Sequence, residues 1–396
     1  GTTTGPIEIV RRDYARGYDE VLTIATAPAT TGAAGSLKPS GLETFAMADV
    51  RSLSRSLYDL GGRVVEVDDY FNLASLTYSA STVRLGADAA DYYATKYGYD
   101  HRGRLSRTAR TVAAGAYEIS STAYDALGRP ASESTGTDDP YDGTPATTNM
   151  AVVARYQYDK GGVGDGNLTR KVLYPDTDAS PATARVVDHL YDWRDRLIAS
   201  KFGVKPDWGS GVEGTDVQRQ TIYYDRDNLG RVVAVAAYDS DGVTLAEAKP
   251  SSSLLRSYAT YAYDAQGRLY KQKVFAVDPV AGTWSSSNYL QTSTFYDRRG
   301  DVLAVYAPGG TVAKYSYDGA GRLLATAWSD GDGDGGSWTN AGTLVGDKVL
   351  SESRTTYDAY GDVVKTTALE RSHDSLSTGR LDAPGASGIA DSGFET

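Results

Sequence analysis

Three aspartates at alternate positions, Asp330, Asp332 and Asp334, have the residue type and spacing that best suit binding chemistry in this sequence. Gly335 follows them, and the pattern matches the opening of a calcium loop, in which alternate oxygen atoms converge on a hard cation. The twelfth position of such a loop requires an acid, but Ala341 stands there. The segment is therefore either a calcium site or an acidic loop exposed to solvent, and we expect no other cofactor.

Residues suited to catalysis are sparse. The spacing of the histidines supports neither a histidine-based triad nor a two-histidine metal site, since they are His101, His189 and His373. Cysteine is absent, which excludes disulfides, thiol catalysis and zinc–thiolate sites. The glycine-rich segments lack the strand and helix setting that phosphate binding needs. We predict that the protein is not an enzyme.

One short phrase, Tyr-Asp-x-x-Gly-Arg followed by aliphatic residues, recurs along most of the chain, with copies about 33 residues apart on average. The clean copies begin at Tyr58, Tyr99, Tyr124, Tyr263 and Tyr317. The weaker copies are Tyr224-Asp225, with two extra residues before Gly230-Arg231; Tyr191-Asp192, with Asp195 where glycine belongs; Tyr296 and Tyr357, with Asp301 and Asp362 in place of arginine; and Tyr158-Asp159, which keeps Gly162 but loses the arginine. Function should therefore be sought in the repeat, because a catalyst does not need so many copies.

Each copy has the sequence of a β-hairpin. Apolar residues alternate with polar ones before the aspartate, as in Tyr261-Ala262-Tyr263, and this places both tyrosines on one face of a strand. The aliphatic run after the arginine predicts a second strand. Between the strands, the aspartate accepts a local backbone N–H and the glycine supplies a positive φ, which is the pattern of a type I turn closed by a glycine bulge. Because an isolated hairpin is marginal in water, the copies must stack side by side.

The arginine and aspartate of the phrase have two structural readings. In the first, an arginine of one hairpin meets a carboxylate of the next and forms a ladder along the stack. In the second, both are solvated residues at the turn tips. In either case we expect structural roles for these charges.

The repeat phrase resembles that of the YD-repeat, or Rhs, family, which includes bacterial polymorphic toxins, shell components of insecticidal toxin complexes and the animal teneurins. The resemblance covers roughly residues 55 to 366. It implies an all-β fold in which the stacked hairpins form one continuous winding antiparallel sheet, either as an open stack or as part of a hollow cocoon. Periodicity alone predicts only the stacked hairpins.

Three segments follow from the extent of the repeat. Residues 55–370 form the repeat tract, and residues 1–54 are a degenerate repeat or an N-terminal extension that includes Tyr18-Asp19. Residues 371–396 lack strand alternation and contain the run Ala-Pro-Gly-Ala-Ser-Gly, which predicts a flexible C-terminal tail. The chain begins at Gly1 without an initiator methionine, and we expect it to be part of a longer protein.

Composition narrows the environment and the partners. The chain has 30 tyrosines but only 6 phenylalanines and 2 methionines, which favours sheets with half-wet faces over one dense apolar core. Its net charge of −11, without clustered cations, argues against nucleic-acid binding. No apolar stretch approaches the roughly 20 residues that a membrane helix needs, so we expect no membrane insertion. The absence of cysteine fits an extracellular or cell-surface bacterial protein.

These observations favour a structural or interaction segment of a large secreted or surface bacterial protein. Its partners would be other copies of itself, or adjacent repeats of a longer chain, assembled into a fibre or matrix element. One alternative is a segment of a shell that encloses a toxin. Another is a carbohydrate-binding adhesion module, whose candidate aromatic residues are Trp193, Trp208, Trp284, Trp328 and Trp338.

Overall fold

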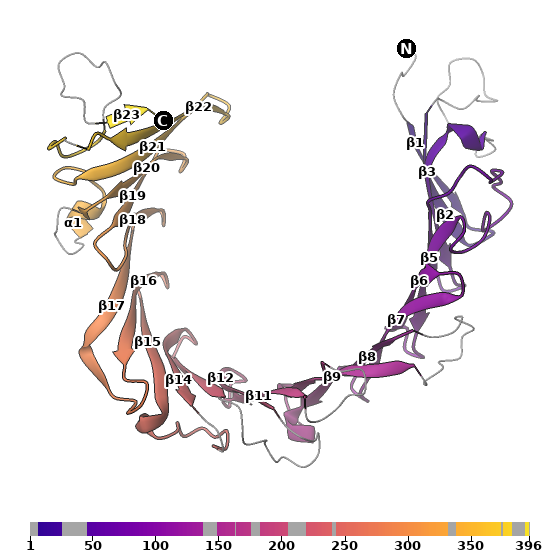
Figure 1. Ribbon diagram of the computed structural model, residues 1–396, viewed down its shortest axis with the longest axis horizontal. Helices are drawn as coiled ribbons and strands as arrows, with labels where there is room; N and C mark the ends of the chain where they lie inside the picture. Colours follow the sequence, from indigo (N-terminus) through magenta and orange to yellow (C-terminus); the bar gives the residue numbers. More distant parts are fainter. Residues whose placement is uncertain are drawn as a thin grey trace. The chain divides into compact units, whose positions relative to one another are not determined.

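The computed structural model describes residues 7–25, 46–137, 149–162, 164–175, 183–204, 219–239, 243–331, 338–373, 375–381 and 393–395. Antiparallel strands dominate these residues, and the helical segments are short. The strands succeed one another in chain order within each part of the chain (Figure 1). The predicted all-β fold of stacked hairpins is therefore confirmed. Within the described residues, no helix is both long enough and apolar enough to cross a membrane.

The chain divides into two compact units, Gly1–Val187 with Gly203–Gly214, and Asp188–Phe202 with Thr215–Thr396. In the first unit each strand pairs antiparallel with the next along the chain, from β1 to β10. Its elements are β1 Ile7–Asp13, β2 Tyr18–Ile24, η1 Met47–Asp49, β3 Val50–Tyr58, β4 Val64–Tyr70, β5 Tyr92–Tyr99, β6 Leu105–Ala113, β7 Ala116–Tyr124, β8 Pro130–Gly136, β9 Met150–Tyr158, η2 Asp159–Gly161 and β10 Leu168–Leu173. The boundary between the units falls within β11, Arg185–Tyr191.

The second unit repeats this arrangement from β12 to β23, again with each strand antiparallel to the next. Its elements are β12 Leu197–Val204, β13 Gln220–Arg226, β14 Val232–Asp239, η3 Ser252–Leu254, β15 Leu255–Tyr263, β16 Leu269–Val277, β17 Trp284–Tyr296, β18 Val302–Tyr306, β19 Val312–Tyr317, β20 Leu323–Ser329, α1 Trp338–Ala341, β21 Val349–Tyr357, β22 Val363–Arg371 and β23 Gly393–Glu395. Both units are thus meanders of hairpins.

The repeat phrase forms the hairpin turns, as its residue types predict. In the copy that begins at Tyr263, the Asp264 N–H donates to the Arg268 carbonyl at 2.9 Å, and the Gly267 N–H donates to the Asp264 carbonyl at 3.0 Å. Gly267 has a φ of 83°, in the left-handed region that favours glycine. The strand register shifts between Ala262 and Tyr263, which marks the bulge. The predicted turn type is confirmed.

One copy lies at a different register from the one that its sequence suggested. The turn between β13 and β14 begins at Asp227, whose N–H donates to the Arg231 carbonyl, and not at Asp225. Arg226 therefore occupies the position that tyrosine holds elsewhere, and it pairs with Val232 across the strands. The two apparent extra residues in this copy disappear once the phrase is aligned on Asp227. The turn is therefore marked by an aspartate three residues before the glycine, and not by the Tyr-Asp pair.

The core consists of separate small clusters within each unit. In the first unit, Leu22, Leu53 and Tyr92 are buried with Leu85, which belongs to the connection between β4 and β5. In the second unit, Ala199, Tyr223 and Leu255 form a cluster of their own. Tyrosine occurs in these clusters, as the composition predicted, and it is accompanied by alanine, which was not predicted. Each cluster therefore depends on a few strands and on the connection that covers them.

Irregular connections cover one face of the strands. We call the face of β2–β5 that carries Leu22, Leu53 and Tyr92 the covered face, and residues 71–91, which lie over it, the strap. The strap is attached by hydrogen bonds from strand side chains to its backbone, for example from the Tyr18 hydroxyl to the Ala80 carbonyl at 2.6 Å. The Leu85 N–H of the strap donates to the Tyr70 hydroxyl at 2.9 Å. A long loop thus becomes part of the packed structure.

Part of the predicted flexible tail packs against the last strands of the second unit. Leu381 is fully buried with Val349 and Leu369, and its N–H donates to a Glu352 side-chain oxygen at 3.1 Å. Strand β23 pairs with β22 at Leu369–Arg371 (Figure 1). These two segments are packed, whereas residues 383–388, the Ala-Pro-Gly-Ala-Ser-Gly run on which the prediction of a flexible tail depends, lie outside the described residues. The packing of Leu381 was not predicted, because a single residue carries no strand alternation.

Replacing Gly267 by alanine should lower the free energy of unfolding by about 1–2 kcal/mol, because a Cβ at positive φ is strained. The space at this position is adequate, since an added Cβ would lie 3.8 Å from the Arg231 guanidinium. Gly319→Ala is the matched control, because Gly319 lies outside the left-handed region and has nothing within 4 Å of its added Cβ. Urea denaturation measures both, and equal effects would contradict the turn assignment.

Candidate functional site

The most regular chemical feature of the structure is the arrangement around each turn arginine. In the copy at Asp264, one carboxylate oxygen accepts the backbone N–H groups of Gln266 and Arg268, each at 2.9 Å. The other oxygen accepts the Arg268 Nε–H at 2.7 Å. The aspartate therefore closes the turn and holds the guanidinium at the same time, and the side chain of Arg268 is only 25% exposed.

The same guanidinium also contacts the next hairpin. It lies over the ring of Tyr296, with 4.5 Å between the guanidinium carbon and the ring centroid. Its Nη1 donates to the Asp297 carbonyl at 3.0 Å, and the Tyr296 hydroxyl donates back to the Leu269 carbonyl at 2.9 Å. We call this set of contacts the clamp: a turn aspartate, its arginine and the tyrosine of the following hairpin. Each clamp joins two hairpins through charge, ring and backbone.

The clamp recurs in both units with little variation. The distance from the guanidinium carbon to the ring centroid lies between 4.1 Å and 4.9 Å at every recurrence. The pairs are Arg63 with Tyr99, Arg104 with Tyr124, Arg129 with Tyr158, Arg231 with Tyr263, Arg268 with Tyr296 and Arg322 with Tyr357.

These contacts correct the expected ladder of arginines and carboxylates. The carboxylate that binds each arginine belongs to the same turn. The next hairpin contributes a tyrosine ring, and at Arg268 and Arg322 it also contributes a backbone carbonyl, at 3.0 Å and 3.4 Å. The exception is Arg129, whose Nη1 donates to the Asp159 side chain of the following turn at 2.9 Å. Sequence spacing alone could not distinguish these arrangements, because the same charges fit both.

Where the phrase departs from its consensus, other residues replace the missing contacts. Asp301 stands where arginine is expected, and Arg299 from the turn tip instead donates to the Gly319 and Asp318 carbonyls at 3.0 Å and 3.2 Å. In the turn at Asp227, Arg226 takes the place of tyrosine and donates to the Leu197 carbonyl at 3.1 Å. The link between neighbouring hairpins is thus kept by a different side chain.

The clamp shifts the titration of its aspartates. Desolvation of the Asp100 carboxylate favours its neutral form, but hydrogen bonds from the Arg104 backbone N–H and guanidinium outweigh it and lower the pKa to about 2. At Asp264 the backbone N–H of Arg268 is the largest cause of a lowered pKa. Hydrogen bonds to the ionised form stabilise that form. The turns therefore retain their charge well below neutral pH.

Buried cations attach irregular segments to the second unit. Lys314 on β19 is only 4% exposed and pairs with Asp347 at 2.7 Å. Its ammonium also donates to the Asn340 and Thr343 carbonyls at 2.9 Å and 2.8 Å. Because all of these partners belong to the segment between β20 and β21, one buried charge orients that segment on the strands.

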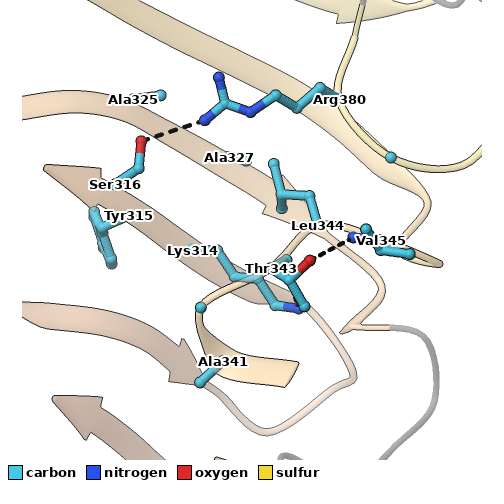
Figure 2. Close-up of a pocket in the computed structure, with 12 residues that line it drawn as sticks. Lys314, Tyr315, Ser316, Ala325, Ala327, Ala341, Thr343, Leu344, Val345 and Arg380 are labelled. Atoms are coloured by element: carbon cyan, nitrogen blue, oxygen red, sulfur yellow. Dashed lines mark hydrogen bonds between the residues drawn. The ribbon is translucent and has the colours of Figure 1, made fainter. Parts of the chain in front are cut away.

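A pocket of about 280 Å³ lies beside Lys314 in the second unit (Figure 2). Alanines of β20 and polar residues of β19 form one side, and Leu344 and Val345 form the other. The Arg380 guanidinium reaches across the pocket and donates to the Ser316 hydroxyl at 3.3 Å (Figure 2). The cations are already engaged by protein groups, so the geometry points to no reaction.

The predicted calcium residues are only partly described. Asp330 lies at the end of β20, where its side chain accepts the Lys348 N–H at 2.8 Å. Asp332 and Asp334 lie outside the described residues, so calcium binding remains a prediction. In the part of the chain that is described, no group of three or more His, Asp or Glu side chains is arranged to hold a metal ion.

The histidines and tryptophans lie at scattered positions. His189 is half-buried beside the Ser200 hydroxyl, 3.0 Å from its Nδ1, and burial lowers its pKa. Trp193 is an exposed turn-tip residue beside Arg194, and Trp284 packs against Tyr258. The side chains of Trp208 and Trp338 lie outside the described residues. The clamp arginines and tyrosines, in contrast, both belong to the phrase that was visible in the sequence, but the pairing of each arginine with the tyrosine of the following hairpin was not predicted.

Residues 296–334, which include one clamp tyrosine and the turn at Asp318, match the family model named RHS Repeat. Residues 296–334 are therefore an Rhs, or YD, repeat. The recognition made from Tyr-Asp-x-x-Gly-Arg is therefore confirmed. No curated protein matches the sequence of this Rhs-repeat chain.

Solved structures with some similarity to the Rhs-repeat chain include toxin-complex proteins. A TcdB2-TccC3 crystal structure is 14% identical, with 81% of this chain and 16% of that chain covered and a TM-score of 0.37. A TcdB2-TccC3-Cdc42 structure is 13% identical, with 93% and 18% covered and a TM-score of 0.39. The Photorhabdus luminescens Tc holotoxin pore is 14% identical, with 88% and 22% covered and a TM-score of 0.20. The Rhs-repeat chain spans less than a quarter of each.

A double-mutant cycle tests whether the clamp couples neighbouring hairpins. Arg268→Met and Tyr296→Leu should show a coupling of about 0.5–1 kcal/mol in the free energy of unfolding, because the two side chains share one partly exposed contact. The control cycle combines Arg268→Met with Tyr263→Leu, whose ring contacts Arg231 instead. Chemical denaturation gives the four stabilities of each cycle. Additivity in the first cycle would remove the clamp as a link.

Acid should weaken the turns. A carboxylate with a lowered pKa contributes stability above its unfolded pKa of about 3.9, and this contribution is lost as the pH falls towards the folded value. For Asp100 the folded pKa is about 2, so the loss should occur between about pH 4 and pH 2. Carboxyl NMR titration with Asp100→Asn as the assignment control measures this value directly. Titration of Asp100 near 4 would contradict the role given to Arg104.

Proposed function

We propose that this chain is a non-enzymatic structural segment of a large secreted or surface-attached bacterial Rhs-repeat protein. The observation that carries the proposal is the clamp, which recurs from turn to turn. In each clamp the arginine contacts both its own hairpin and the next one. The most regular chemistry of the chain therefore serves the mechanical connection of its own repeats. A scaffold needs this property, whereas a reaction site does not.

Nearest-neighbour links also suit a segment of variable length. In a repeat protein, stability is approximately the sum of the repeat stabilities and of the interfaces between neighbours. Arg322 joins its hairpin to Tyr357 in the same way that Arg268 joins its hairpin to Tyr296. Additional hairpins could therefore be added without a new type of contact. This supports partnership with adjacent repeats of a longer chain or with another copy.

Copies of the chain would associate end to end through the edges of their terminal strands. Among the described residues, β1 pairs only with β2, and β23 covers the outer edge of β22 only at Leu369–Arg371. Strand edges carry N–H and C=O groups that can recruit another strand. A strand of seven residues, such as β1, would extend the sheet of a second copy along the part of β22 that does not pair with β23.

A shell segment that encloses a toxin remains the alternative within the same family. It would use the same clamp, but its ends would be satisfied by other parts of a longer chain instead of by a second copy. Mass measurement of the chain in solution distinguishes the two arrangements, because only the fibre proposal requires concentration-dependent association.

Light scattering and negative-stain electron microscopy of the 396-residue chain should show linear assemblies that grow with concentration. Val10→Lys on β1 should reduce them at least about tenfold, because an edge lysine opposes strand addition. Val274→Lys is the matched control, since Val274 is also exposed, 41% against 56% for Val10, but pairs with Ala259 of β15 and with Leu290 of β17. Monomers at all concentrations would remove the fibre proposal and leave an isolated scaffold segment.

A further inference from the structure

Asp68 on β4 is a buried acid without a hydrogen-bonding partner. Its exposed fraction is 0%, and neither carboxylate oxygen accepts a hydrogen bond from the described residues. The neighbouring strands place Arg55 and Ala94 directly opposite it. An ionised carboxylate in this position is costly unless it is paired. The charge of Asp68 therefore depends on whether the Arg55 guanidinium can pair with it.

Arg55 cannot serve Asp68, because other groups engage its guanidinium. Glu20 on β2 accepts from Nε at 2.8 Å and from Nη2 at 2.6 Å. The remaining donors bind the strap, where Nη1 donates to the Thr82 and Val83 carbonyls and Nη2 donates to the Ser79 carbonyl. Arg55 is itself fully buried. A single cation thus neutralises Glu20 and attaches the strap to β3.

The other charged groups around Asp68 also form hydrogen bonds with other residues. Arg84 of the strap donates to both oxygens of Glu66 on β4, and its Nε lies 3.9 Å from Asp68. Asp88, also in the strap, accepts the Thr111 and Tyr117 hydroxyls at 2.8 Å and 2.9 Å, and the Lys96 ammonium of β5 donates to the Tyr117 hydroxyl. Tyr70 and Tyr92 complete the surroundings from β4 and β5.

Burial and the negative charge of Glu66 both favour the neutral form of Asp68. Burial is the larger cause, and together with Glu66 it raises the pKa of Asp68 to about 8. Ionisation would require either Arg55 to leave the strap carbonyls, Arg84 to leave Glu66, or water to enter beneath the strap. Each of these changes breaks a contact that attaches residues 71–91 to the strands.

We propose that the strap is a proton-controlled latch, which closes on β3–β5 while Asp68 carries a proton and loosens when Asp68 ionises. The direction of the pH dependence of closure follows from proton linkage. Between about pH 4, where an exposed aspartate ionises, and the folded value of about 8, the closed form keeps a proton that the open form has lost. Closure therefore weakens as the pH rises through this window and becomes independent of Asp68 above it.

Hydrogen exchange of the strap amides tests the latch. Corrected for the intrinsic rate, protection of the Leu85 amide should fall about tenfold for each pH unit between pH 5 and pH 7 and level off above pH 8. Asp68→Asn, which mimics the protonated acid, should abolish this dependence. Asp69→Asn is the control, because Asp69 is the next residue, on the opposite face, and accepts the Ser54 hydroxyl there. Equal pH dependence in all three proteins would overturn the proposal.

A second measurement needs no variant and remains informative if Asp68→Asn does not fold. Carboxyl NMR of the unaltered chain should show one aspartate that titrates near pH 8 together with strap amide shifts at the same midpoint. Titration of every aspartate below pH 5, or strap exchange that does not follow the high-pH titration, would also overturn it.

Discussion

The structure depends on the aspartate that begins each turn. Because its carboxylate binds the backbone of the turn and the guanidinium four residues later, the arginine is positioned before it meets the next hairpin. For example, Asp264 holds the Arg268 side chain within its own turn, and the guanidinium then contacts the Tyr296 ring of the next hairpin. Pre-positioning reduces the side-chain entropy lost when hairpins stack, so a partly exposed cation can still contribute to the contact. Stacking then follows from local turn geometry.

The sheet can remain rich in tyrosine because its turns and its buried positions are stabilised by different contacts. The clamps occupy the turn edge, where tyrosine rings meet cations and their hydroxyls bind backbone carbonyls. Elsewhere, buried cations bind the carbonyls of irregular segments: Arg55 does so on the covered face of the first unit, and Lys314 does so on β19 of the second unit. A loop without secondary structure needs partners for its backbone groups, and a buried cation with several donors supplies them. Small separate cores under such loops replace one large apolar core.

Exceptions to the phrase show which part of it matters. Arg299 and Arg226 lie at different positions from the usual arginine and tyrosine, yet both donate to carbonyls of a neighbouring hairpin. Asp195 holds a φ of 58° where glycine stands in other turns, because aspartate tolerates the left-handed region better than most residues. The backbone geometry of the turn and a link to the neighbour are preserved, while the side chains that provide them change.

The sequence by itself determined the hairpins, the turn type, the glycine positions and the absence of one dense core. These features arise from contacts within about five residues or from overall composition, and both are visible in a single chain. Only the tertiary structure decided that each arginine binds its own aspartate, that Tyr224-Asp225 is not a turn, that Leu381 is buried and that Asp68 is buried without a hydrogen bond. Such contacts depend on strand register and on where long connections fold back. Neither is encoded in local spacing, since one-residue shifts exchange the two faces of a strand.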